Sequence, residues 1–183
     1  MFRGEVFLKR VSDIVGMTVV DSKGSPVGEV ARVLCSRTRG RVLGIIVKRR
    51  RLARGGTVVH YKDILSFGDD LLIINDKSAG QNRDIPDISS PAEGEDVTGY
   101  SVITADGREL GVIRDTVIGE SNGSIEGYLV AGDLFEDLLR GRKLLKLERS
   151  AVVGKGTVVL GDGAAADGTV KSGGLENLLR LKS

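Results

Sequence analysis

The sequence lacks several features that define common protein classes. It has one cysteine, Cys35, so a disulfide within the chain is excluded, and nothing indicates an oxidising compartment. No apolar run approaches the ~20 residues that cross a bilayer as a helix. The first eight residues lack the apolar core of a signal peptide. We therefore expect a cytoplasmic protein without a membrane span.

Residues suited to catalysis or metal binding are also scarce. His60 is the only histidine, and no motif places an acid or nucleophile beside it, so we interpret it as an ordinary strand residue. Cys35 alone cannot form a zinc site, which takes several nitrogen or sulfur ligands. Asp69 and Asp70 are adjacent and would point to opposite faces of a strand, so we predict a turn there. We predict no enzymatic activity, no cofactor and no bound metal.

Glycine, in contrast, is abundant, with 26 residues, and much of it follows a repeated pattern. A shift of 83 positions superimposes residues 15–30 on residues 98–113. The glycine pairs that this shift aligns are Gly16 with Gly99, Gly24 with Gly107, Gly28 with Gly111 and Gly44 with Gly127. The repeat indicates two similar domains of roughly 80 residues, each large enough for one compact core.

Short β-branched runs separated by glycine-containing turns predict strands rather than long helices. In the first repeat such runs recur at intervals of about 10–15 residues, as expected for a small all-β domain. This spacing leaves no room for the helical crossovers that usually join parallel strands. We therefore predict a mostly β protein of two tandem small antiparallel β-barrels, each closed because closure removes exposed sheet edges.

The composition also suggests boundaries. We place the first barrel at residues 1–76 and the second at residues 95–162. Residues 77–94, with their prolines, serines and charges, predict a linker. Residues 163–183 predict a flexible tail that includes a short C-terminal helix.

The second repeat departs from the first at residues 133–141. Asp133 and Glu136 have the spacing of a capping box, which predicts a short helix. The apolar residues that would share one face of this helix, and that we propose as a protein contact, are Leu134, Phe135, Leu138 and Leu139.

Charge is distributed unevenly along the chain. The net charge is +2, but residues 1–94 carry +5 and residues 95–183 carry −3. The candidate contacts for an anionic partner are Arg37, Arg39, Arg41, Lys48, Arg49, Arg50, Arg51 and Arg54. These side chains either bind phosphates or belong to a solvated loop that keeps the domain soluble. The absence of interleaved aromatic residues argues against recognition of single strands by stacking.

The repeated glycines, together with the segment from Val59 through Asp63 and Ile64 to residues 68–73, resemble the PRC-barrel family in two tandem copies. The family members that the chain resembles include the cytoplasmic domain of the photosynthetic reaction-centre H subunit and the C-terminal barrel of the ribosome maturation factor. The resemblance implies a small β-barrel that docks onto other macromolecules rather than a catalyst.

We therefore expect a non-catalytic adaptor that binds another macromolecule through its β-barrel surfaces. The alternative is binding of RNA or a ribonucleoprotein through the basic face of the first barrel. The partner itself is left open: it is an unidentified protein, RNA, or a second copy of the chain in a homodimer.

Overall fold

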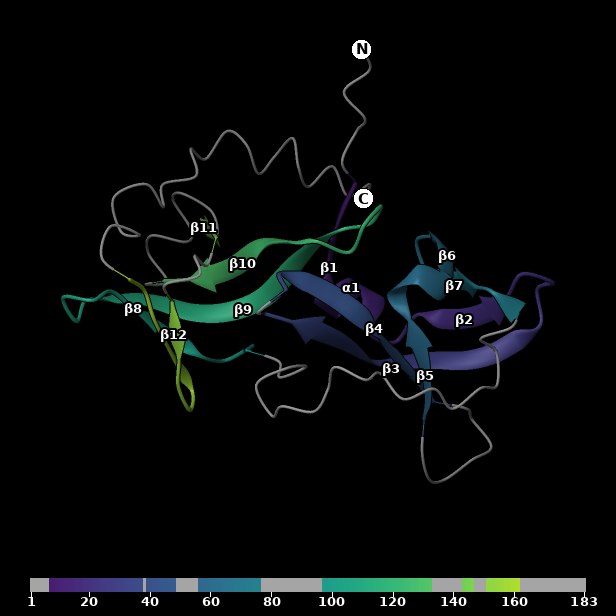
Figure 1. Cartoon of the computed structure of the whole chain (residues 1–183), viewed down its shortest axis with the longest axis horizontal. Helices are drawn as coiled ribbons and strands as arrows, with labels where there is room; N and C mark the ends of the chain where they lie inside the picture. Colours follow the sequence, from purple (N-terminus) through teal and green to yellow (C-terminus); the bar gives the residue numbers. More distant parts are fainter. Residues whose placement is uncertain are drawn as a thin grey trace, which may run out of the picture. The chain divides into compact units, whose positions relative to one another are not determined.

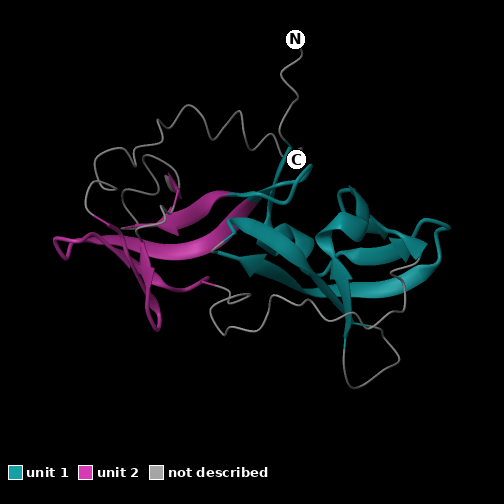
Figure 2. Cartoon of the chain, viewed as in Figure 1, with its two compact units in different colours: residues 1–96, 118–125 teal, residues 97–117, 126–183 magenta. Residues whose placement is uncertain are grey.

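The computed structural model describes residues 7–37, 39–48, 56–76, 97–132, 143–146 and 151–161. These residues are mostly strands, arranged in two sheets (Figure 1). The chain divides into two compact units (Figure 2). Unit 1 comprises Met1–Asp96 and Ile118–Ile125, and unit 2 comprises Val97–Val117 and Glu126–Ser183. A short part of the second repeat therefore belongs to unit 1.

Unit 1 is built around a six-stranded sheet with the order β5-β4-β3-β2-β7-β6. The strands of this sheet are β2 (Thr18–Asp21), β3 (Pro26–Ser36), β4 (Arg41–Lys48), β5 (Thr57–His60), β6 (Ile64–Phe67) and β7 (Leu71–Ile74). A short strand β1 (Leu8–Arg10) and a one-turn helix α1 (Val11–Ile14) precede it, and a 3-10 turn η1 (Tyr61–Asp63) joins β5 to β6. The chain thus passes from one edge of the sheet to the other through three residues.

Unit 2 repeats the same arrangement. The strands of the second sheet follow the order β11-β10-β9-β8-β13-β12, and β1 pairs with β9 beside this path. Their bounds are β8 (Ser101–Ile103), β9 (Glu109–Gly119), β10 (Ile125–Ala131), β11 (Lys143–Leu145), β12 (Val152–Val153) and β13 (Thr157–Val159).

The prediction of mostly β structure in two similar parts is confirmed, but the prediction of closed antiparallel barrels is wrong. Both sheets are open, and no ladder joins β5 to β6 in the described part of the chain. Strand β2 pairs in parallel with β7, and β8 pairs in parallel with β13. These parallel pairs need no crossover helix, because the intervening antiparallel strands themselves carry the chain back. The helices predicted near residues 134–139 and in the tail lie outside the described residues.

The repeated glycines have two physical reasons, and each reason recurs in the second repeat. Gly24 and Gly107 adopt φ of 82° and 84°, a left-handed turn conformation that glycine adopts readily. Gly28 and Gly111 lie where strands approach closely. A Cβ atom on Gly28 would clash with the carbonyl oxygen of Lys48, and one on Gly111 would clash with that of Ala131. The repeat therefore preserves both turn geometry and strand contact.

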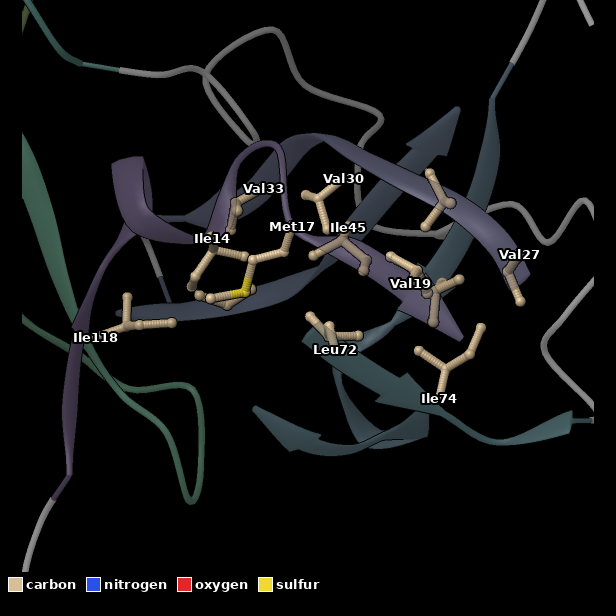
Figure 3. Packing of buried hydrophobic residues seen from close by; sticks show 13 residues of the cluster. Ile14, Met17, Val19, Val27, Val30, Val33, Ile45, Leu72, Ile74 and Ile118 are labelled. Carbon is tan, nitrogen blue, oxygen red and sulfur yellow. The ribbon is translucent and has the colours of Figure 1, made fainter. Parts of the chain in front are cut away.

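The core of unit 1 is a cluster of buried aliphatic side chains from its strands and α1 (Figure 3). It also contains Ile118, which is completely buried although it comes from the end of β9. Ile125, at the start of β10, packs against the same cluster. Residues 118–125, which we call the β9–β10 tip, therefore complete the core of the first unit.

Backbone hydrogen bonds join the β9–β10 tip to the turn between β3 and β4 in a reciprocal way. The Val42 N–H donates to the Gly123 carbonyl (2.7 Å), and the Ile125 N–H donates to the Gly40 carbonyl (2.8 Å). The shift of 83 positions converts one bond into the other, and the two residues between them form an antiparallel bridge. The two turns thus meet through equivalent positions of the two repeats.

We expect Ile118→Ala to destabilise unit 1 by about 2–5 kcal/mol, because it removes a fully buried aliphatic side chain from the core and leaves a cavity. Native-state hydrogen exchange of the β4 amides measures this loss within unit 1. The control is Val152→Ala in unit 2, whose side chain is 65% exposed. Unchanged exchange in β4 would show that the tip does not contribute to this core.

Candidate functional site

Unit 1 contains a cleft of about 750 Å³ between the edge of its sheet and the β9–β10 tip. The lining includes the start of β4, the end of β5, two residues of η1 and all of β6. It also includes Phe7 and residues 120–122 of the tip. The residues that line the cleft are Phe7, Arg39, Arg41, Val42, Leu43, His60, Tyr61, Lys62, Ile64, Leu65, Ser66, Phe67, Glu120, Ser121 and Asn122.

Three polar side chains attach the tip to the rest of unit 1. The Tyr61 hydroxyl lies 2.8 Å from the carbonyl oxygen of Glu120, to which it donates. The Arg41 guanidinium donates to the carbonyl of Asn122 at 3.0 Å. Lys9 donates to the carbonyl of Gly68 at 2.8 Å, and its ammonium lies 3.6 Å from the Glu120 carboxylate. The wall of the cleft is therefore attached at several points.

Tyr61 is the central element of this attachment. Burial, reinforced by the negative charge of Glu120, raises the pKa of the Tyr61 hydroxyl to about 12, so the hydroxyl stays protonated at neutral pH. Its ring packs against Gly123, where an added Cβ would come within 2.8 Å of the ring. Gly123 also has φ of 69°, a conformation that favours glycine. The tip and Tyr61 therefore fit each other closely.

The charge of the lining residues is predominantly positive. Arg39, Arg41 and Lys62 are all exposed at the cleft. Among the described lining residues the one carboxylate is that of Glu120, and Lys9 lies beside it. A concave surface with several cations and one partly neutralised anion attracts negatively charged groups.

Large apolar side chains are exposed at the same cleft. Phe7 is 63% exposed and Leu65 is 57% exposed, although both belong to the residue types that usually lie in cores. Leu65 lies at a β-bulge of β6, where the register with β7 shifts between Ile64 and Ser66. The cleft therefore combines cationic groups with apolar surface, which suits a ligand that carries both acidic and apolar groups.

The structure separates the basic residues proposed from the sequence. Arg39 and Arg41 line the cleft, and Arg37 lies in the same turn, where its carbonyl accepts from the Gly40 N–H at 3.1 Å. Lys48 is at the opposite end of β4, about 23 Å along the strand from Arg41. It stands opposite Glu29 of β3. The candidates that lie outside the described residues are Arg49, Arg50, Arg51, Arg54, Leu134, Phe135, Leu138 and Leu139.

The other residues considered from the sequence lie in a strand, beside the core or in a turn. His60 is the last residue of β5, pairs with Gly44 and also borders the cleft. Cys35 is half-buried and packs against the core. Asp69 and Asp70 are exposed between β6 and β7, which confirms the predicted turn. Within the described ranges, no group of three or more His, Cys, Asp or Glu residues could hold a metal ion.

Sequence reasoning missed the remaining members of the cleft. Tyr61 and Lys62 carry no motif, and Glu120 lies 59 positions after Tyr61. Phe7 and Leu65 are ordinary apolar residues in the sequence, and only their exposure in the folded chain distinguishes them. A local pattern could not reveal this cleft, because its walls come from segments distant in the chain.

Comparison with known families identifies the two repeats. Residues 8–80 and 92–164 each match the model of the PRC-barrel domain. A comparison with curated proteins found no match. None of the helices in the described ranges is long and apolar enough to cross a membrane.

The raised pKa of Tyr61 predicts an alkaline loss of stability. The unfolded side chain loses its proton near pH 10, while the folded one keeps it to about pH 12. In this window the unfolded state binds fewer protons, so the free energy of unfolding falls as pH rises. We expect Tyr61→Phe to abolish this part of the decline. Below pH 9 the hydroxyl of the unaltered chain keeps its hydrogen bond, so the variant should lose about 1 kcal/mol of the free energy of unfolding.

Chemical denaturation at a series of pH values measures both effects. Tyr100→Phe is the control, because it removes a tyrosine that does not line the cleft. An alkaline slope that is equal in the Tyr61→Phe variant and the unaltered chain would contradict the prediction.

Proposed function

The chain belongs to the PRC-barrel domain family, and from this membership we propose that it is a docking protein that binds a segment of another protein in the cleft of unit 1. PRC-barrel domains are often protein-interaction modules and are generally non-catalytic. In this proposal the chain acts as an adaptor in the cytoplasm and catalyses no reaction.

The observation that carries this proposal is the combination of side chains exposed at one cleft. Arg39, Arg41 and Lys62 line the same cleft as the exposed apolar side chains of Phe7 and Leu65. A concave, partly apolar surface with a few convergent polar groups is the usual form of a binding site. Exposed large apolar groups rimmed by polar ones mark interaction surfaces more often than they mark solvated faces.

Capture from cells tests this function. A tagged full-length chain is crosslinked to its neighbours, treated with nuclease and purified. We expect a partner protein that remains bound after nuclease treatment. Leu65→Glu should lower the amount of this captured protein at least about tenfold, because the change places a charge on apolar contact surface. Val152→Glu, at a similarly exposed apolar side chain of unit 2, is the matched control.

The proposed function fails if the captured proteins are the same for Leu65→Glu and the unaltered chain. It also fails at this cleft if light scattering shows a dimer that Leu65→Glu converts to a monomer, since a second copy of the chain would then occupy the surface.

The second candidate function is binding of RNA or a ribonucleoprotein by unit 1. The observation that favours it is the cluster of Arg37, Arg39 and Arg41 at one turn, together with the basic sequence 48–54. Contacts with phosphates predict an affinity that falls steeply with salt. We expect replacement of Arg49, Arg50 and Arg51 by alanine to remove most binding to bulk RNA. Absence of binding at low salt in the unaltered chain would exclude this candidate.

A further inference from the structure

The open edge of β6 forms one border of the cleft. All four residues of β6, from Ile64 to Phe67, line it. The bulge at Leu65 interrupts the alternation of side chains between the two faces of this strand. Because β6 is the last strand of the six-stranded sheet, the cleft borders an edge strand. In the described part of the sheet, β6 pairs with β7 alone, which leaves this edge open (Figure 1).

Backbone groups of β6 point towards this open side. The Gly68 N–H donates to the Leu71 carbonyl at 2.7 Å, which makes these two residues a hydrogen-bonded pair. Hydrogen-bonded and non-hydrogen-bonded pairs alternate in an antiparallel ladder. Phe67, which stands opposite Leu72, is therefore in a non-hydrogen-bonded pair, and its N–H and C=O point away from β7. These groups are available to an added strand.

The surroundings of this edge define the chemistry of such a strand. Lys62 immediately precedes β6, and Arg39 and Arg41 line the same cleft. Leu65 projects from the bulge of β6, and Phe7 is exposed at the cleft. In an extended peptide, alternate side chains point in opposite directions, so acidic and apolar residues that alternate would separate onto two sides. Such a segment matches both the charge and the apolar surface of the cleft.

We propose that the partner segment is an acidic, extended peptide that pairs through its backbone with the open edge of β6. Its backbone meets the N–H and C=O of Phe67, its apolar side chains contact Leu65 and Phe7, and its carboxylates lie near Arg39 and Lys62. Strand addition of this kind takes affinity from backbone hydrogen bonds and specificity from alternate side chains. This inference rests on the proposed docking function and adds the chemistry and the binding mode of the partner.

The test uses the full chain labelled with ¹⁵N and an eight-residue peptide of alternating glutamate and valine. NMR titration at pH 7 and low salt follows the amides of Lys62, Leu65 and Phe67. We expect shifts confined to the cleft and slower hydrogen exchange of the Phe67 amide, because this N–H gains a backbone acceptor. The same peptide with lysine in place of glutamate should bind at least about tenfold more weakly, because its charges repel the cations of the cleft.

Two further comparisons separate backbone pairing from simple charge attraction. N-methylation of alternate peptide amides removes the donors of one peptide edge, and we expect one of the two methylation patterns to weaken binding about tenfold and the other to have little effect. Lys62→Glu, which reverses an exposed charge, should weaken binding about fivefold. Val152→Glu in unit 2 should leave binding unchanged.

The inference is overturned if the acidic peptide does not bind at millimolar concentration, or if both methylation patterns weaken binding equally. It is also overturned if RNA displaces the peptide and shifts the Phe67 amide signal as much as the peptide does. The docking function is judged separately by the capture experiment. A captured protein that is sensitive to Leu65→Glu, combined with no binding of the acidic peptide, would keep the docking function and reject strand addition.

Discussion

The contact between the β3–β4 turn and the β9–β10 tip is the constraint on which the cleft of unit 1 depends. Two reciprocal backbone hydrogen bonds join the turns, and Ile118 fills the core beneath them. A hydrogen bond between turns is worth little by itself, because water competes for the same groups. Burial of Ile118 supplies the additional free energy that keeps the tip in place.

The cleft follows directly from this contact. Residues 120–122 of the tip line the cleft together with Tyr61, Arg41 and β6. With the tip attached by Tyr61 and Arg41, the same residues enclose about 750 Å³. Arg41 therefore takes part in both the structure and the charge of the cleft, because it donates to the tip, whereas Lys62 makes none of the contacts that attach the tip. This difference makes Lys62 the better position for probing recognition.

The open edge of β6 connects the fold with the proposed function. An unpaired strand edge is a liability in a soluble protein, because it can pair with any extended chain. In unit 1 this edge carries a bulge at Leu65 and faces a cationic cleft. Both features restrict which chains can add to it. Under the proposed binding mode, these features favour acidic segments over other extended chains.

The sequence by itself determined the duplication, the predominance of strands and the family. It could do so because these glycines are required by local structure: Gly24 lies in a left-handed turn, and Gly28 lies where two strands approach closely. The same two requirements recur at Gly107 and Gly111. The parallel pairing of β2 with β7 and the open sheet edges were decided by tertiary structure. So was the separation of Lys48 from Arg41, which are close in the sequence but lie at opposite ends of one strand. The cleft was equally beyond local patterns, because long-range packing of Ile118 brings residues 120–122 against Tyr61, and no spacing along the chain encodes that approach.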